Sequence, residues 1–557
     1  MAKVPKAIDL SKISKRISEL NITPKVELEK LTAALKRYNP QGVHSIENIP
    51  QDFKASLQSF KRDVGRFHGA RANLLWFQRN AVNSACSDKF GYMTSAGTRA
   101  SSKLPFDNTS IALLEALGNM MGMPGRDNAA GDAQLPSGFT YFGQFVDHDI
   151  TLDVSSSIDV ETDATTINNM RSPSLDLDSL YGLGPALNPF LYEFPTGAIP
   201  STAIKFKLGT NTAGLSGGPS TNGGGFGGMQ IQTDFDLPRV TGSNTAAIGD
   251  PRNDENLFVS QFHMAMLKFH NAVIDFLIID NFSGDLFVEA KKLVTQHYQW
   301  ALVHDFLKRI CGQLAVNNAL LSVNAAIGSP FSMPVEFSVA AYRFGHSLIR
   351  PNYWNNHRET NLSLMQAFEF IRNPNLPVHS EKVVDFNAFF ETGITVPIFN
   401  RARKIDSALT NGLANLPGFS GIMASLAIRN LRRGLALGLP SGQATALANG
   451  IVPLTIAQLK SGLPTDESNL LSSQGGLLLN KTPLWYYILR EAAVLEGGQK
   501  LGPLGSKIVA ETFIRMLKRN ESSYLNVVGG FTPSLPSNVA GDFTVADLII
   551  FSGANQP

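Results

Sequence analysis

Apolar residues gather in helix-length segments along most of the chain. Strands and helices do not alternate in the way that a parallel sheet requires, and no internal repeat appears. Short loops rich in Gly and Pro join the segments. We therefore predict a mostly α fold with little β structure, formed by a single large helical domain. The segments predicted as helices are Leu113–Met121, Ser137–Asp149, Asp250–Ile274, Phe287–Leu314, Ser338–Ile349, Leu362–Arg372, Ile422–Leu431, Pro483–Leu495, Lys507–Lys518 and Val545–Phe551.

The first hundred residues have a different pattern. Residues 1–100 are mostly polar, with two short helical segments, Pro24–Tyr38 and Phe53–Phe67, and no candidate chemistry. We predict an N-terminal arm here and a domain over residues 101–557. The segment Met1–Leu20 lacks the apolar core of a signal peptide, and no uninterrupted apolar run reaches the roughly 18 residues that span a membrane. We expect a soluble protein that is cytoplasmic or exported by a non-classical route.

Composition excludes several classes of function. The chain is 43% hydrophobic and 17% charged, with 35 Phe, which suits a deep apolar core. A net charge of +2 without a clustered basic face gives no reason to expect nucleic acid as a partner. The two cysteines, Cys86 and Cys311, provide neither a disulfide framework nor metal-ligand spacing.

The most informative stretch is Phe142–Asp153, which places four polar side chains among apolar residues. If Ser137 caps the helix, Gln144 and His148 are one turn apart and share a face. Asp147 and Asp149 flank that face, about 100° to either side. Buried carboxylates need a hydrogen-bonded, ionic or metal partner. The alternative is a solvated helix face with a hydrogen-bonded histidine.

A second motif, Arg171–Gly182, alternates oxygen-bearing and apolar side chains before a turn. Such loops bind hard cations such as Ca²⁺, which take six to eight oxygen ligands. The spacing is not that of an EF-hand, and a turn stabilised by Asp and Ser side chains explains it equally well.

Two further segments carry polar groups on predicted helices. Asp250 and Pro251 suit the cap and first position of a long helix, on which Arg252 and Glu255 share a face. Farther along the chain, Gly345 immediately before His346 permits the close approach of a flat or bulky group. Four other histidines are expected to be buried in the core with satisfied hydrogen bonds: His263, His270, His297 and His304.

Together these side chains form a constellation suited to haem. A haem takes one imidazole as its axial ligand, here His346, and leaves the opposite face to His148. A neutral imidazole there could take a proton from hydrogen peroxide and return it to the leaving oxygen. Arg252 would stabilise the developing charge. Gln144 would position peroxide, water or halide, and the carboxylates Asp147 and Glu255 would reach the haem edge.

Four motifs resemble, in order, those of the animal-type haem peroxidases, the peroxidase–cyclooxygenase superfamily that includes myeloperoxidase and lactoperoxidase. These motifs are FGQFVDHDIT, SLDLDSLYG, DPRNDEN and YRFGHSLI. A looser match is Ile428–Gly434, and the segments Pro483–Glu511 and Gly541–Ile549 resemble bacterial members. The similarity extends from about Leu104 to the C-terminus.

The resemblance implies a peroxidase that reduces hydrogen peroxide and oxidises halide, pseudohalide or small aromatic donors through a ferryl intermediate. It implies haem b and Ca²⁺ as cofactors. The implied catalytic residues are His148, Arg252 and Gln144. The implied haem-binding residues are His346, Asn430, Arg343, Asp147 and Glu255. His346 would be the iron ligand, and Asn430 would bond the other ring nitrogen of His346 and raise the basicity of the imidazole. Asp147 and Glu255 match carboxylates that form ester links to haem. The implied calcium ligands are Asp149, Ser172, Ser174 through its carbonyl, Asp176 and Asp178.

The chain also departs from the family pattern. Asn256 stands where some members have a methionine that forms an extra sulfonium link, so we expect weaker oxidation of chloride than of bromide, iodide or thiocyanate. Asp178 replaces a serine, which makes the loop more acidic. Arg343 occupies the position of the radical-forming tyrosine of cyclooxygenase-like members, with Tyr342 one residue further away.

Three alternatives to a peroxidase remain. One is a haem fatty-acid dioxygenase of the same fold, which would consume oxygen with a polyunsaturated fatty acid. Another is a divalent-metal phosphohydrolase built on the adjacent pair His148 and Asp149, which would need further His and Asp ligands for two metals. The third is a binding module that has the fold without activity.

Overall fold

The computed structural model describes residues 89–126, 131–153, 155–211, 234–369 and 377–555. The helical segments predicted at Pro24–Tyr38 and Phe53–Phe67 lie outside these ranges, as does Cys86. Within the described residues, helices dominate and each strand has two to five residues. The predicted mostly α fold is therefore confirmed.

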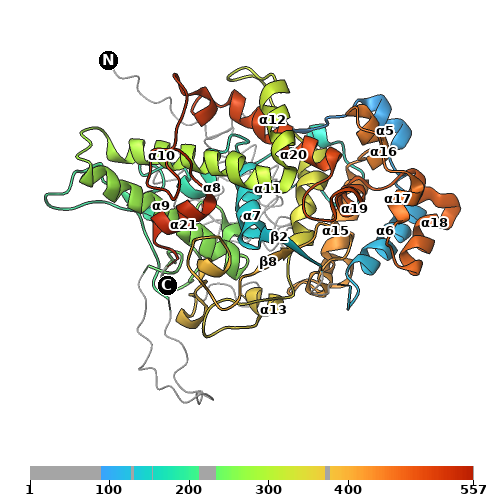
Figure 1. Ribbon diagram of the computed structural model, residues 1–557, viewed down its shortest axis with the longest axis horizontal. Coiled ribbons are helices and arrows are strands. Elements are labelled where there is room, and N and C mark those ends of the chain that lie inside the picture. The colour runs from blue at the N-terminus through green and yellow to red at the C-terminus, as the bar shows by residue number, and fades with distance from the viewer. Residues whose placement is uncertain (1–88, 127–130, 154, 212–233, 370–376, 556–557) are drawn as a thin grey trace, which may run out of the picture.

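A central helix, α7 (Gly138–Ile150), packs against the long helix α9 (Leu257–Ile279). α9 in turn packs against α10 (Leu286–Ala301) and α21 (Val545–Ser552), so that α7 lies near the middle of the molecule (Figure 1). Aromatic rings fill the α7–α9 interface. Phe142 and Phe145 both contact Phe262, with ring centroids 5.7 and 5.4 Å apart.

On the other side of α7, α6 (Asn108–Met121) packs against α15 (Leu426–Ala436). The two backbones approach closely because Gly118 has no side chain: a Cβ there would lie 2.8 Å from the backbone nitrogen of Ile428. Next to α15 lies α19 (Leu484–Glu496), which also contacts α20 (Pro503–Arg519).

Shorter helices complete the fold. The remaining α-helices are α5 (Ala96–Ser102), α8 (Asp178–Tyr181), α11 (Leu307–Cys311), α12 (Gln313–Ser322), α13 (Leu364–Ala367), α16 (Gly442–Ala448), α17 (Ile456–Lys460) and α18 (Thr465–Asn480). Single 3₁₀ turns are η3 (Ala164–Thr166), η4 (Pro189–Leu191), η9 (Ser380–Lys382), η10 (Phe386–Ala388), η11 (Asn411–Ala414), η12 (Gly421–Ala424) and η13 (Tyr524–Asn526).

In the part of the chain that the structure describes, the strands form four two-stranded sheets, one of which is parallel. The pairs are β1 (Lys89–Gly91) with β5 (Ser332–Pro334) in parallel, and in antiparallel β2 (Asp132–Pro136) with β8 (Arg401–Arg403), β3 (Tyr192–Glu193) with β4 (Lys205–Phe206), and β6 (Asn352–Tyr353) with β7 (Leu362–Ser363). Phe90 of β1 is buried in the core. Residues 89–100, which we assigned to the N-terminal arm, therefore pack as part of the described domain.

One predicted helix is two separate elements. Asp250 caps a 3₁₀ turn, η5 (Pro251–Asp254), because its side chain accepts from the Arg252 backbone N–H. Asn256 then caps α9 by accepting from the backbone N–H of Val259 at 3.0 Å. The prediction of a single helix starting at Asp250 was wrong, because a second cap follows the first within six residues.

Two other predicted helices are interrupted. Phe287–Leu314 includes a π turn, η6 (Leu302–Phe306). It is interrupted again at Gly312, which has a φ of 83° and ends α11. Ser338–Ile349 is a π turn, η7 (Glu336–Ala340), followed by a 3₁₀ segment, η8 (Ala341–Leu348). π turns inside helices are rare and frequently accompany functional sites.

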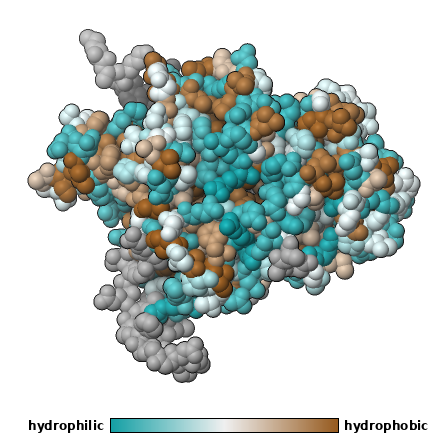
Figure 2. Space-filling view, viewed as in Figure 1, coloured by the Kyte–Doolittle hydropathy of each residue, from teal (hydrophilic) through white to brown (hydrophobic). Residues whose placement is uncertain are grey.

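Among the described residues, α9 is the one helix that is long and apolar enough to cross a membrane by length and composition. Its most apolar window is 61% buried inside the fold, as is usual for a core helix of this length. The face in Figure 2 is largely hydrophilic across its centre, with apolar patches toward the end where Figure 1 labels α16 and α17. Exposed apolar side chains on α16, on α17 and between these helices are Leu447, Val452 and Ile456.

Candidate active site

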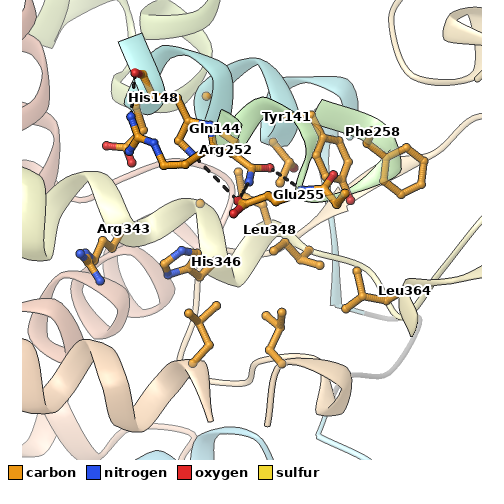
Figure 3. A pocket seen from close by; sticks show the side chains of 18 of the residues that line it. Tyr141, Gln144, His148, Arg252, Glu255, Phe258, Arg343, His346, Leu348 and Leu364 are labelled. Atoms are coloured by element: carbon orange, nitrogen blue, oxygen red, sulfur yellow. Dashed lines mark hydrogen bonds and ion pairs between the residues drawn. The ribbon is translucent and has the colours of Figure 1, made fainter. Parts of the chain in front are cut away.

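A cavity of about 1230 Å³, including space that opens to solvent, lies between α7 and η5 on one side and η8 on the other. Gln144, His148 and Arg252 line one wall, and Arg343 and His346 line the opposite one (Figure 3). The remaining lining is mostly apolar, with Tyr141, Phe258, Leu348, Ile349, Leu364, Ala367, Phe368, Leu413, Leu416, Phe419 and Leu426. The structure thus brings residues from three separate sequence motifs to one cavity.

α7 presents its polar groups as its periodicity predicts. Gln144, Asp147 and His148 line the cavity, whereas the fully buried Asp149 accepts hydrogen bonds from the start of α8 and the residue before it. The predicted cap is wrong in detail: Ser137 precedes the helix, but its side chain makes no capping bond, and its hydroxyl has no hydrogen-bond partner among the described residues.

His148 is held by a hydrogen bond from the side away from the cavity. Its Nδ1 lies 2.7 Å from Oδ1 of Asn253, and its Nε2 lies 3.8 Å from Oε1 of Glu255. Burial, reinforced by the positive charge of Arg252, lowers the pKa of His148 to about 3. The imidazole is therefore neutral over the ordinary pH range, as a general base must be.

Arg252 lies on a buried ion-pair network beside His148. Its Nε and Nη2 bind the carboxylate of Asp250, and Nη2 also donates to the backbone carbonyl of His148 at 2.9 Å. Arg171 pairs with the same carboxylate. Burial alone would raise the pKa of Asp250, but Arg171 and Arg252 together hold it well below its usual range. The network fixes the guanidinium of Arg252 at the cavity wall.

Two carboxyl groups, those of Glu255 and Asp147, also line the cavity. Gln144 Nε2 donates to Glu255 Oε1 at 2.6 Å, while Oε2 is buried with no hydrogen-bond partner among the described residues. Burial raises the pKa of Glu255 to about 8. Burial also raises the pKa of Asp147, whose Oδ1 accepts from the hydroxyl of Thr151 at 3.0 Å.

On the opposite wall, η8 carries His346 and Arg343. Nδ2 of Asn430, on α15, lies 2.8 Å from Nδ1 of His346, and Nη1 of Arg343 donates to Oδ1 of Asn430 at 2.6 Å. Burial, with Arg343 and Arg429 nearby, lowers the pKa of His346 to about 3. A Cβ on the adjacent Gly345 would meet no protein atom within 4 Å, so a flat group has room against the backbone here.

The direction of the Asn430 contact differs from our expectation. An arginine side chain only donates, so the amide oxygen must face Arg343 and the amide nitrogen must face His346. An N–H donated to the ring withdraws electron density from it, so this contact does not raise the basicity of His346 as predicted.

Three carboxylates meet beside α7. Ligand oxygens of Asp149, Asp176 and Asp178 all lie within 4.8 Å of one another. The loop curls around them because Leu175 and Leu177 adopt left-handed backbone conformations, with φ of 52° and 57°. Burial and the charge of Asp176 raise the pKa of Asp149 to about 7. Three carboxylates this close together repel one another, and they are the oxygen donors that a hard cation binds.

The other predicted ligands lie in the same loop. The backbone N–H of Ser172 donates to Asp178 Oδ2 at 3.1 Å, and the carbonyl of Ser174 accepts from Nδ2 of Asn520 at 2.8 Å. A carbonyl oxygen has two lone pairs, so Ser174 retains one for a cation. Arg171 pairs with Asp178 as well, which ties this loop to the Asp250 network.

Sequence reasoning missed Asn253 and the role of His263. Asn253 Nδ2 lies 2.9 Å from Nδ1 of His263, so one amide joins His148 to a second buried imidazole. The only signal in the sequence was the position of Asn253 between Arg252 and Glu255. Two other histidines are hydrogen-bonded core residues, as predicted: His270 bonds Tyr181 and the Ile204 carbonyl, and His297 bonds backbone groups.

The sequence model of the family described as animal haem peroxidase matches residues 158–534, more than half of the chain. The chain therefore belongs to the animal haem peroxidase family, whose members generally bind haem and act as oxidoreductases. The match includes Arg252, His346 and Asn430 and begins after α7.

Curated relatives and solved structures agree with this family. A peroxidasin homologue, pxn-2 of Caenorhabditis elegans, is 26% identical over 303 residues, which are 50% of this chain and 21% of that protein. A peroxidase-like protein of Margaritifera margaritifera is 28% identical over 219 residues, 34% of this chain and 26% of that protein. The chain thus spans only about a fifth to a quarter of the length of these relatives.

The fold is also similar to solved structures of low sequence identity. Peroxidase A of Dictyostelium discoideum is 16% identical, with a TM-score of 0.52 over 79% of this chain and 88% of that one. A fatty acid alpha-dioxygenase of Arabidopsis thaliana is 12% identical, with a TM-score of 0.50 over 96% and 93% of the two chains. At these identities the similarity describes the fold alone.

Proposed function

We propose that the protein is a haem peroxidase that reduces hydrogen peroxide and oxidises halide, pseudohalide or small aromatic donors. The observation that carries this proposal is the position of His148. Its Nδ1 is bonded to Asn253, its Nε2 is directed to the cavity, and His346 lies on the opposite wall. One imidazole can thus serve as a base and the other as an iron ligand.

The residues around the cavity fit a haem. His346 would ligate the iron through Nε2, which requires the Asn430 amide to turn so that its oxygen accepts a hydrogen bond from a protonated Nδ1. Gly345 leaves room for the flat ring system. Arg343 offers positive charge on the same wall. Asp147 and Glu255 line the cavity with carboxyl groups suited to ester links, and Oε2 of Glu255 lacks a protein partner among the described residues. The haem, when bound, supplies an iron centre that exchanges electrons with peroxide and with donors.

Three residues of the chain would each have a separate role in the cleavage of peroxide. Neutral His148 takes a proton at Nε2 from one peroxide oxygen and returns it to the departing oxygen. Arg252, held by Asp250, stabilises negative charge that develops as the O–O bond breaks. Gln144 orients the incoming molecule through its amide, which is itself positioned by Glu255 and Asn256.

A calcium ion is the second part of the proposal. Asp149, Asp176 and Asp178 would bind it, with Ser172 and the carbonyl of Ser174. Because Asp149 follows His148 directly on α7, an ion bound there would anchor the helix that carries the base.

Two rival functions fit the site less well. In the dioxygenase alternative, a tyrosine three residues before the iron ligand forms the reactive radical, but Arg343 occupies that position. The neighbouring Tyr342 donates a hydrogen bond of 3.1 Å from its hydroxyl to the Gly143 carbonyl. In the phosphohydrolase alternative, His148 and Asp149 would share metals. They point to different sites, and the clustered metal ligands among the described residues are three carboxylates without a histidine.

The test is an absorption spectrum of the haem-supplemented protein before and after one equivalent of hydrogen peroxide. A Soret band that shifts within seconds and recovers on adding iodide or a phenol supports the peroxidase. A Soret band indifferent to peroxide, with oxygen uptake on adding a polyunsaturated fatty acid, would favour the dioxygenase. Absence of a Soret band would exclude both haem functions.

A further inference from the structure

His263 has a contact that its expected role as a plain core residue does not explain. It lies on α9, is fully buried, and its Nε2 has no hydrogen-bond partner among the described residues. Its Nδ1, in contrast, lies 2.9 Å from Nδ2 of Asn253, whose Oδ1 lies 2.7 Å from Nδ1 of His148. The three side chains form a single line from the core to the cavity.

The chemistry of the amide sets the direction of both hydrogen bonds. A primary amide donates only from nitrogen and accepts only at oxygen. Nδ1 of His263 must therefore accept, and Nδ1 of His148 must donate. Both rings are buried and bonded to a neutral amide rather than to a carboxylate, so each ring is neutral and has one protonated nitrogen. It follows that Nε2 of His148 has a free lone pair and that the proton of His263 is on Nε2.

We propose that Asn253 and His263 are positioning residues that hold His148 in the tautomer whose Nε2 lone pair faces the cavity. This inference deepens the proposed peroxidase function and rests on it, because only that tautomer can take a proton from peroxide. Asn253 selects the tautomer of His148, and His263 selects the orientation of Asn253. Oε1 of Glu255 lies 3.8 Å from Nε2, which is too far to occupy the lone pair.

The opposite arrangement would disable the base. If the amide of Asn253 were reversed, His263 would donate from Nδ1, and His148 would accept at Nδ1 and carry its proton on Nε2. An N–H would then face the cavity, and it could not accept a proton. The two buried histidines therefore change tautomer together through one amide.

The first experiment measures the tautomers directly, in the full chain labelled with ¹⁵N-histidine and without added haem. Spectra of His148→Gln and His263→Gln assign the two rings among the ten histidines. We expect a protonated Nδ1 and bare Nε2 for His148 and the reverse for His263. In Asn253→Leu, which has similar size and no polar atoms, the Nδ1 proton of His148 should decrease in favour of Nε2. A wild-type His148 protonated on Nε2, or an unchanged pattern in Asn253→Leu, would overturn the proposal.

Asn253→Asp is the matched conservative variant, which also keeps the proposal testable if Asn253→Leu fails to fold. A carboxylate accepts hydrogen bonds from both neighbours. His148 should keep its wild-type tautomer, and His263 should reverse to donate from Nδ1. A reversed His148 in this variant would contradict the proposed mechanism of selection.

The second experiment measures the rate at which hydrogen peroxide changes the Soret band of the haem-loaded variants. We expect Asn253→Leu to react about 10- to 100-fold more slowly, less than the ~10²–10⁴-fold contribution of a general base, because a fraction of rings keeps the active tautomer. Asn253→Asp should stay near the wild-type rate, whereas a merely structural role would impair both variants alike. If no haem binds, the proposed function fails, and the nitrogen spectra still decide the tautomer.

Discussion

Gln144 donates a hydrogen bond of 2.6 Å to Oε1 of Glu255, while the other carboxyl oxygen, Oε2, is buried with no hydrogen-bond partner among the described residues. One neutral hydrogen bond does not replace the water that an ionised carboxylate loses on burial. The pKa of Glu255 is therefore raised by burial to about 8, and the group is mostly protonated at neutral pH.

This raised pKa predicts a dependence of stability on pH. Between its unfolded value of 4.5 and its folded value of about 8, Glu255 binds a proton in the folded chain but not in the unfolded chain. Stability is therefore lost as pH rises through this window, by at most about 1.4 kcal/mol per pH unit from this group. Glu255→Gln removes the titration, so it should lose less stability than the wild type between these pH values.

Denaturant unfolding of the full chain at several pH values measures this difference. Glu521→Gln, a substitution at an exposed surface position, is the control and should follow the wild type. Equal pH dependence in Glu255→Gln and the wild type would show that Glu255 is ionised in the folded chain.

His148→Ala should retain haem and lose peroxide cleavage. The substitution leaves His346 in place but removes the only imidazole that the described residues place on the α7 side of the cavity. The rate of the Soret change on mixing with hydrogen peroxide should fall by about 10²–10⁴-fold, the usual contribution of a general base. His304→Gln is the control, since His304 stacks on Trp300 outside the cavity. A wild-type rate in His148→Ala would refute the assignment of the base.

Much of this site was predictable because its residues lie on regular or motif-like segments. One helical turn is enough to place Gln144 and His148 on one face, and the sequence order of the motifs indicated His346 and Asn430. The helix limits near Asp250 were not predictable from propensity, because both Asp250 and Asn256 are good caps, and in the structure each begins its own element.

Contacts between elements were also beyond the sequence. The line from His148 through Asn253 to His263 joins α7, η5 and α9, and no periodicity relates residues on three elements. The direction of the Asn430 bond depends on Arg343, which donates to the amide oxygen. A motif can indicate that Asn430 lies near His346, but only the third partner determines which end of the amide faces the ring.

His346→Ala should fail to hold haem through gel filtration, because the described residues place no other imidazole on the cavity wall opposite His148. Free imidazole added with haem should restore part of the Soret band, since the space vacated by the side chain can accept the small ligand. Retention of a wild-type Soret band without imidazole would show that another residue ligates the iron.

Calcium should stabilise the full chain through the three carboxylates. A ligand at 100-fold excess over its Kd adds ~2.7 kcal/mol to the free energy of unfolding, so Ca²⁺ should raise the thermal midpoint and EGTA should lower it. Asp149→Asn should abolish this response, whereas Asp280→Asn, at an exposed position at the end of α9, should keep it. Mg²⁺ should be less effective because it demands a smaller octahedral site. A midpoint indifferent to Ca²⁺ and EGTA would remove the ion from the proposed function.

The preference among halides should follow from Asn256. This residue caps α9, lines the cavity and donates to Oε1 of Gln144 at 3.2 Å. The family resemblance implies that an amide here replaces the methionine that forms a sulfonium link to haem in some members. Without that link the bound haem should be a weaker oxidant, and chloride is the halide hardest to oxidise. We expect turnover with iodide, thiocyanate and bromide to exceed turnover with chloride by on the order of tenfold or more, equivalent to about 1.4 kcal/mol in the barrier. Peroxide consumption at equal halide concentrations measures the order, and chloride turnover equal to that of bromide would show that the sulfonium link is unnecessary for chloride oxidation in this protein.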